Sequence, residues 1–258
     1  MAISLASLKR SSDRKPPRML IYGTAGIGKT TLGTNAPAPV FIQTEDSEVD
    51  CPTFGLLKTY DEVMDAMASL VTEPHDFKTV VLDSLDWLEP IVWRETCKRN
   101  KWAQIEDAGF GKGYVAALDT WREVLDGFTA LRDERSMGVI ILAHCEIKRF
   151  DSPETEPYDR YQIKLQKAAS ALVQEHVDAV LFANYRVSTV KADAGFNRKA
   201  VRGVGAGDRR LYTTERPAFL AKNRFGLADS IDLDWPTLAA GISYYSTQTQ
   251  AAPSAASE

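Results

Sequence analysis

Apolar runs and amphipathic segments alternate along most of the chain. Five runs have the length and the continuous apolar character of strands buried on both faces: residues 18–23, 40–44, 78–84, 138–144 and 178–185. Five other segments space their apolar residues as helices do, or follow a loop that opens a helix: residues 29–35, 61–71, 86–101, 113–134 and 163–176. Strands that alternate with helices predict an α/β fold, with a mostly parallel central sheet, right-handed crossovers and flanking helices.

The remaining segments lack this alternation. Residues 145–162 are rich in proline and charge, which predicts an irregular loop. Residues 186–216 alternate β-prone stretches with the turn signals AGFN and GVGAGD, which predicts antiparallel hairpins that extend one edge of the sheet. We therefore expect a basic flexible arm over residues 1–17, one domain over residues 18–245, and a disordered tail over residues 246–258.

Composition narrows the class of protein. Of the 258 residues, 44% are hydrophobic and 26% are charged, and no apolar run reaches the length of a membrane span. The N-terminus turns basic after a weak apolar start, which is the reverse of a signal peptide, so we expect a cytoplasmic protein with no membrane partner. The three cysteines are scattered, with no histidine cluster beside them, which argues against a disulfide framework or a zinc site.

The net charge of −4 is unevenly distributed. Residues 1–18 carry five basic side chains against one acidic side chain, and residues 198–224 carry eight against two. The rest of the chain is therefore strongly acidic. Basic patches on an acidic body are compatible with a polyanionic partner, but a solvated hairpin with scattered charges has the same composition, and both interpretations stay open.

A phosphate-binding loop follows the first predicted strand. The pattern GxxxxGK[ST] is matched in full by Gly23, Thr24, Ala25, Gly26, Ile27, Gly28, Lys29 and Thr30. Glycines let the backbone N–H groups of such a loop turn inward around phosphate oxygens. We expect Lys29 to bind the β- and γ-phosphates, Thr30 to ligate Mg²⁺, and Thr31 to bind the α-phosphate. No guanine-reading NKxD motif is present, which favours ATP over GTP.

Polar residues end the neighbouring predicted strands. Asp83 closes an apolar strand and is the expected second holder of Mg²⁺. Ser84 follows it, where many ring ATPases place the catalytic glutamate. We therefore expect the base that orients water to be Glu45, with Asp46 and Glu48 as competitors, unless Glu45 is a solvated acid of the loop. His144 ends another strand and is expected to contact the γ-phosphate and report hydrolysis, unless it is a plain strand-end histidine.

Several of these segments together resemble the RecA-like recombinase core. They are FIQTED (41–46), VVLDS (80–84), VIILAH (139–144) and AKNRFG (221–226). The last is similar to the segment that reaches ATP on a neighbouring subunit, which implies catalytic roles in trans for Lys222 and Arg224. Over residues 18–235 the chain looks most like phage-encoded ATPases of this core, which are associated with single-strand annealing and recombination.

That resemblance implies ATP, Mg²⁺, single-stranded DNA, self-assembly into rings or filaments, a single-strand-binding protein as partner, and the host cytoplasm as location. It also places a DNA-contacting loop after His144, where Arg149, Phe150 and Arg160 are candidate DNA ligands, although an ordered loop with buried tyrosines is an equal alternative. Lys112 lies in the glycine-rich stretch GFGKGY and is a further candidate, but this stretch more simply separates two helices.

Three functions are compatible with these features. The leading hypothesis is a DNA-dependent ATPase that assembles on single strands and promotes annealing or strand exchange. The second is a small-molecule P-loop kinase, and the third is a motor or loader that moves another protein on DNA. Dependence on DNA separates the first function from the second, and annealing of naked complementary strands separates the first from the third.

Overall fold

The computed structural model describes residues 15–193 and 199–246. A ten-stranded sheet runs through these residues, in the order β10-β8-β7-β1-β5-β4-β2-β3, with β6 paired to β5 and β9 paired to β7. Five strands form its parallel centre: β1 (Arg18–Gly23), β2 (Pro39–Gln43), β4 (Thr79–Asp83), β5 (Gly138–Phe150) and β7 (Ala179–Asp193). The short strand β3 (Thr53–Leu56) continues the parallel pairing at one edge. The predicted α/β fold with a mostly parallel sheet is confirmed.

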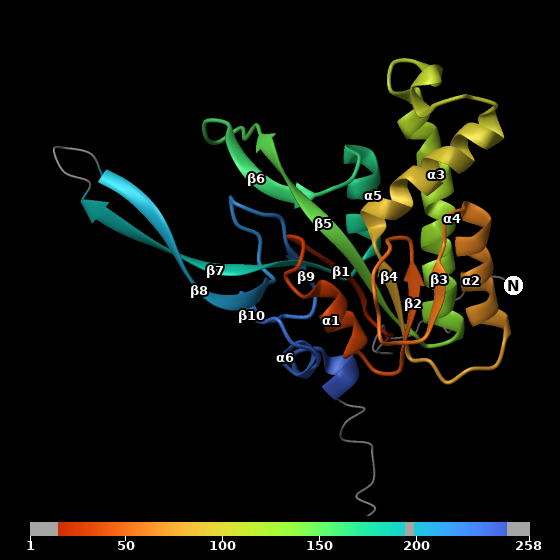
Figure 1. The fold of residues 1–258 in the computed structure, drawn as a ribbon, viewed down its shortest axis with the longest axis horizontal. Helices are drawn as coiled ribbons and strands as arrows, with labels where there is room; N and C mark the ends of the chain where they lie inside the picture. The colour runs from red at the N-terminus through yellow and green to blue at the C-terminus, as the bar shows by residue number, and fades with distance from the viewer. Residues whose placement is uncertain (1–14, 194–198, 247–258) are drawn as a thin grey trace, which may run out of the picture.

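The antiparallel strands lie at the other edge of the sheet and alongside the carboxyl-terminal half of β5. They are β6 (Tyr158–Ile163), β8 (Lys199–Tyr212), β9 (Lys222–Asn223) and β10 (Ser230–Asp232). The predicted antiparallel extension is therefore present, but β7 and β8 form one long hairpin that projects from the body (Figure 1). The stretch GVGAGD lies within β8 rather than in a turn, and AGFN lies outside the described residues.

Alternation along β1 explains the two layers of helices. Met19 and Ile21 face one side of the sheet and Leu20 and Tyr22 face the other, and all four are fully buried. One side is covered by α2 (Tyr60–Thr72), α3 (Leu85–Asn100), α4 (Lys112–Glu134) and α5 (Lys167–His176). The other side is covered by α1 (Lys29–Thr34) and α6 (Trp235–Ala240), as Figure 1 shows. Both faces of β1 are buried, so it forms the centre of the core.

One sequence prediction is wrong in this part of the chain. Residues 145–162 are not an irregular loop, because β5 continues to Phe150 and pairs antiparallel with β6. Both prolines and most of the acidic residues lie in the short connection 151–157, whereas the flanking stretches contain β-branched and aromatic residues that favour strands. The helix expected from residue 163 consequently begins at Lys167, where the side chain of Gln166 caps it by accepting two backbone N–H bonds.

The packing of α4 against the sheet gives a test of this core. Phe128 is fully buried, whereas Val115 on the same helix is 64% exposed. Phe128→Ala should lower the free energy of unfolding by about 3–5 kcal/mol because it leaves a cavity between helix and sheet. Val115→Ala should change it by about 0.5 kcal/mol or less. Urea denaturation measures both values, and similar losses in the two variants would contradict the described layer.

Candidate active site

The phosphate-binding loop starts where β1 ends. Gly23 pairs with His144 of β5 on one side and with Ala183 of β7 on the other. A Cβ atom at Gly23 would collide with the carbonyl oxygen of Ala183, so the close approach of β7 requires glycine here. Gly26 and Gly28 have φ angles of +72° and +108°, which side chains disfavour. These three glycines fix the path of the loop into α1.

Lys29 is the cation inside this loop. The residue is 6% exposed, and its amino group donates hydrogen bonds to the carbonyl oxygens of Gly23 at 3.3 Å and Thr24 at 3.0 Å. Burial lowers the pKa of Lys29, and the nearby carboxylates of Asp83 and Glu45 oppose this effect. A buried ammonium held only by carbonyl oxygens fits the role of a phosphate ligand.

Thr30 and Asp83 meet beside it. The Thr30 hydroxyl donates a hydrogen bond of 3.0 Å to the Asp83 carboxylate, which is nearly buried. Burial raises the pKa of Asp83, and the hydrogen bond from Thr30 opposes the rise. The described residues contain no cluster of three or more histidine, cysteine or acidic side chains that could hold a metal ion alone. A hydroxyl and one carboxylate fit Mg²⁺, which commonly takes its other ligands from phosphates and water.

Ser84 and Asp86 lie between the side chains of Glu45 and His144 and connect them. Ser84 Oγ lies 2.8 Å from Glu45 Oε2 and 3.1 Å from Asp86 Oδ1, and Glu45 Oε2 lies 3.8 Å from His144 Nδ1. Asp86 accepts hydrogen bonds from the backbone N–H of His144 at 3.0 Å and from its ring Nδ1 at 3.1 and 3.2 Å. The sequence predictions for Glu45 and His144 thus fall in one cluster at the edge of the sheet that carries the phosphate loop.

Asp86 is the member of this cluster that the sequence did not single out. Its side chain is 3% exposed. Burial acts to raise the pKa of Asp86, but the hydrogen bonds from His144 and Ser84 outweigh it, so the pKa lies below its usual value. An ionised Asp86 keeps the proton of the His144 ring on Nδ1. The ring can then donate a hydrogen bond through Nε2 only when it is protonated. In the sequence, Asp86 is recognisable as an acidic residue in the first turn of the helix that follows Asp83.

Lys222 and Arg224 do not reach the phosphate loop of their own chain. Lys222 pairs with Val180 near the start of β7, whereas Gly23 pairs with Ala183 further along. The Lys222 amino group donates 2.7 Å bonds to two carbonyl oxygens at the C-terminal end of α5. The Arg224 side chain is 58% exposed, with Nη1 3.8 Å from Asp178. Their roles toward a neighbouring subunit stay predictions.

The four candidate DNA ligands differ in their surroundings. Arg160 is nearly buried, donates to Glu215 at 2.9 Å and stacks its guanidinium 4.6 Å from the centre of the Phe150 ring. The ring contact lies within the β5–β6 hairpin, whereas the bond to Glu215 joins β6 to the segment after β8. Phe150 itself is partly exposed. Arg149 and Lys112 are exposed. Lys112 opens α4 directly after a glycine with positive φ, as expected of a break between helices.

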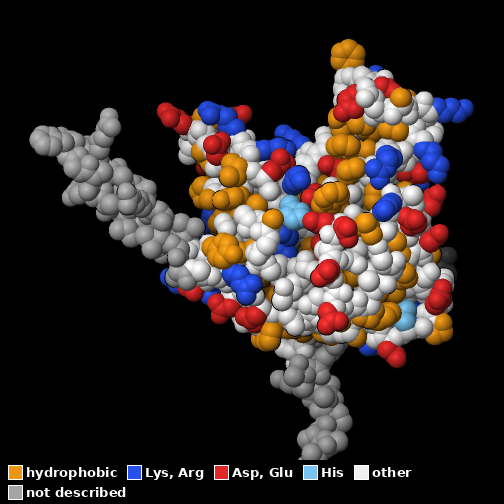
Figure 2. All heavy atoms as spheres, viewed as in Figure 1, with side chains coloured by type: hydrophobic (Ala, Val, Ile, Leu, Met, Phe, Trp, Pro, Cys, Tyr) orange, Lys and Arg blue, Asp and Glu red, His pale blue; other side chains and the backbone are white. Residues whose placement is uncertain are grey.

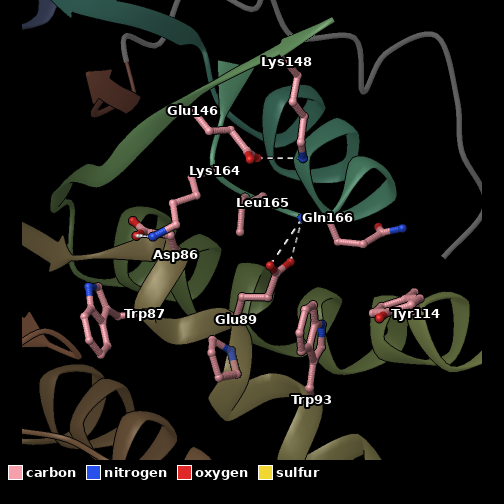
Figure 3. Close-up of a pocket in the computed structure, with 11 residues that line it drawn as sticks. Asp86, Trp87, Glu89, Trp93, Tyr114, Glu146, Lys148, Lys164, Leu165 and Gln166 are labelled. Carbon is pink, nitrogen blue, oxygen red and sulfur yellow. Dashed lines mark hydrogen bonds and ion pairs between the residues drawn. The ribbon is translucent and has the colours of Figure 1, made fainter. Parts of the chain in front are cut away.

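A pocket lies next to Asp86, between α3 and the β5–β6 hairpin. We name it the α3–β6 pocket; it has a volume of about 490 Å³. Its lining includes Trp87, Glu89, Trp93, Tyr114, Lys148 and Lys164 (Figure 3). Figure 2 shows a hollow on the same face, between the hairpin and the upper ends of α3 and α4. Asp86 forms part of the pocket wall, so the pocket and the Glu45–His144 cluster share a residue.

Glu89 is the unusual acid of this pocket. It is 8% exposed, and its carboxylate accepts the backbone N–H of Gln166 at 3.0 and 3.3 Å. Burial raises the pKa of Glu89 to about 7, against the effect of that hydrogen bond. The carboxyl group of Glu89 therefore keeps its proton to a higher pH than an ordinary glutamate does.

The sheet order and the phosphate loop define a P-loop NTPase. Residues 15–225 match the family model described as AAA domain, so the chain belongs to the AAA-domain family. Membership indicates a nucleotide-binding ATPase, and the residues around Thr30 and Asp83 fit the Mg²⁺ that such enzymes usually use. No curated protein matches the chain. Within the described part of the chain, no helix has the length and apolar character needed to cross a membrane.

The raised pKa of Glu89 predicts a pH dependence of stability. In the folded protein Glu89 keeps its proton up to about pH 7. In the unfolded chain the same carboxyl group loses its proton near its ordinary pKa of 4.5. This stabilisation is complete below pH 4.5 and is lost as the pH rises through 7. Relative to Glu89→Gln, the wild-type free energy of unfolding should fall by about 3 kcal/mol across that interval. Urea denaturation from pH 4.5 to 8 measures this difference, and parallel profiles would contradict it.

Proposed function

We propose that this chain is an ATPase stimulated by single-stranded DNA, which assembles on the strand and promotes annealing or strand exchange. The observation that carries the proposal is the shared residue Asp86, which is bonded to His144 on the nucleotide side and lines the α3–β6 pocket on the other. A ligand in that pocket would act directly on the cluster that surrounds the γ-phosphate.

The lining of the pocket favours a nucleic acid strand as that ligand. Trp87 is 52% exposed, and Trp93 lies edge-on to Tyr114 with ring centres 5.3 Å apart, so flat aromatic faces are available for stacking on bases. Lys148 and Lys164 are at least half exposed and can reach backbone phosphates. Stacking on bases is independent of sequence, which fits a protein that must coat any single strand.

The residues of the nucleotide site would divide the work of hydrolysis as follows. Lys29 binds the β- and γ-phosphates, and Thr30 and Asp83 hold Mg²⁺ directly or through water. Bound Mg²⁺ neutralises part of the charge on these phosphates. Glu45 orients the attacking water, and Ser84 fixes the Glu45 carboxylate by a hydrogen bond. His144 contacts the γ-phosphate, and its hydrogen bond to Asp86 fixes the orientation of the ring.

DNA would alter this arrangement through Asp86. Lys164 lies 3.8 Å from Asp86 Oδ2, close enough to stabilise the carboxylate. A DNA phosphate that draws Lys164 away, or a base that displaces Trp87, changes the position of Asp86 and with it the His144 ring. The coupling is reciprocal, so the state of the γ-phosphate would also change the affinity for DNA.

Hydrolysis with and without DNA tests this function. With Mg²⁺ present, we expect single-stranded DNA to raise steady-state ATP hydrolysis tenfold or more, corresponding to about 1.4 kcal/mol of the barrier. Trp87→Ala should raise the DNA concentration for half-maximal stimulation about tenfold, because a stacked base contributes about 1–3 kcal/mol. Phe54→Ala, which removes an exposed ring of the edge strand β3, should leave that concentration unchanged.

If DNA does not change the rate of ATP hydrolysis, this function is excluded. A P-loop kinase that phosphorylates a small molecule is then the better candidate. A DNA-stimulated rate without annealing of naked complementary strands would instead favour a motor or loader.

The proposed assembly gives a second test. Arg224→Ala should bind ATP normally but hydrolyse it slowly, because its guanidinium would act on the neighbouring subunit's ATP. Glu45→Ala should be equally slow for lack of the base. Mixing the two variants should restore activity, because a mixed interface can pair an intact Glu45 site with an intact Arg224. Hydrolysis by mixtures of varied ratio measures this, and a mixture no faster than its parts would refute the trans role.

A further inference from the structure

Arg209 lies on β8, just beyond the strand ends that carry the phosphate loop. Its neighbour along one face, Leu211, pairs with Ala183 and is fully buried among the residues around α1 and α6. Side chains two positions apart on a strand share a face, so Arg209 also faces α1. The backbone is held on both sides, by Tyr185 of β7 and by the Leu233 N–H, which donates to the Arg209 carbonyl at 3.3 Å.

The Arg209 guanidinium rests on the phosphate loop itself. Nη1 donates a long hydrogen bond of 3.4 Å to the carbonyl oxygen of Ile27. A Cβ atom built on Gly28 would lie 2.8 Å from the same nitrogen, so the guanidinium covers the residue that precedes Lys29. This contact joins residues 182 positions apart in the sequence.

Charge distinguishes Arg209 from the residue beside it. Among the described residues no carboxylate lies within ion-pair distance of Arg209, and the bond to Ile27 is its one described side-chain hydrogen bond. Arg210 instead bonds to the Asp232 carboxylate and to Ser230. An exposed guanidinium held against the loop, with four of its five N–H donors unbonded by any described residue, is available to an incoming anion.

The nucleotide site lacks positive charge for such an anion. Three carboxylates, those of Asp83, Asp86 and Glu45, lie close enough to Lys29 to act on its pKa. Mg-ATP adds further negative charge to a place where carboxylates already outnumber the one buried lysine. A second cation on the loop would offset this repulsion, and a planar guanidinium binds phosphate oxygens in pairs.

We propose that Arg209 binds the phosphate chain of the nucleotide held by its own subunit. On nucleotide binding the guanidinium exchanges the weak bond to Ile27 for phosphate oxygens, while β8 keeps its place through Tyr185 and Leu233. This role is independent of DNA and of the proposed contact of Arg224 with a neighbouring subunit.

Affinity for Mg-ATP without DNA tests the proposal, with isothermal titration calorimetry as the readout. Arg209→Ala should weaken binding about tenfold or more, and Arg209→Lys should bind at an intermediate level because it keeps the charge but loses the planar fork. Arg210→Ala, which removes the same charge one position away, should bind as the wild type does. Wild-type affinity of Arg209→Ala would overturn the proposal. Arg209→Lys is also the control for misfolding. Its midpoint of thermal unfolding without nucleotide should match that of the wild type.

Mixing experiments separate action within the subunit from action between subunits. Lys29→Ala should bind no ATP but retains Arg209. If adding it to Arg209→Ala restores wild-type affinity, Arg209 acts on the neighbouring subunit and the proposal fails. Unrestored binding supports it. Tight ATP binding by Lys29→Ala alone would overturn the phosphate-loop assignment, and with it the premise that Arg209 stands at the nucleotide.

Discussion

The parallel pairing of β1 with β5 and β7 is the constraint on which the rest of this structure depends. Because both faces of β1 are buried and both its edges are paired, its end is fixed relative to the ends of its neighbours. Gly23 thereby lies opposite His144, and β4, the next strand after β5, delivers Asp83 to the same edge. The relative positions of the phosphate loop, Asp83 and His144 therefore follow from one backbone register, which hydrophobic burial on both sides of the sheet holds in place.

The sequence predicted the parts of the site that are local. Each apolar strand, and the phosphate loop, consists of consecutive residues. The central sheet and the positions of Lys29, Thr30 and Asp83 could therefore be expected from residue patterns alone. Asp86 could not, because its importance comes from His144, 58 positions away. The β5–β6 hairpin was missed because the proline and charge of its short connection were assigned to the whole segment. The roles of Lys222, Arg224 and the DNA ligands depend on molecules outside this chain, and they stay predictions.

The cluster around Asp86 has an energetic consequence. A nearly buried carboxylate is stable only while hydrogen bonds replace its water, and here they come from His144 and Ser84, with Lys164 close by. If one of these donors is removed, another donor must move towards Asp86 or the carboxylate must take up a proton. The bonds of His144, Ser84 and Asp86 therefore depend on one another, and a change at one of them is felt by the others.

The long β7–β8 hairpin leaves the main sheet next to the phosphate loop. A register shift between Tyr185 and Val187 divides it into a base, which is part of the main sheet, and an outer arm that projects from the body (Figure 1). Arg209 belongs to the base, pairs with Tyr185 and touches the loop that precedes Lys29. A force on the outer arm would therefore reach the phosphate loop through the pairing of β7 with β8 and the contact of Arg209 with Ile27.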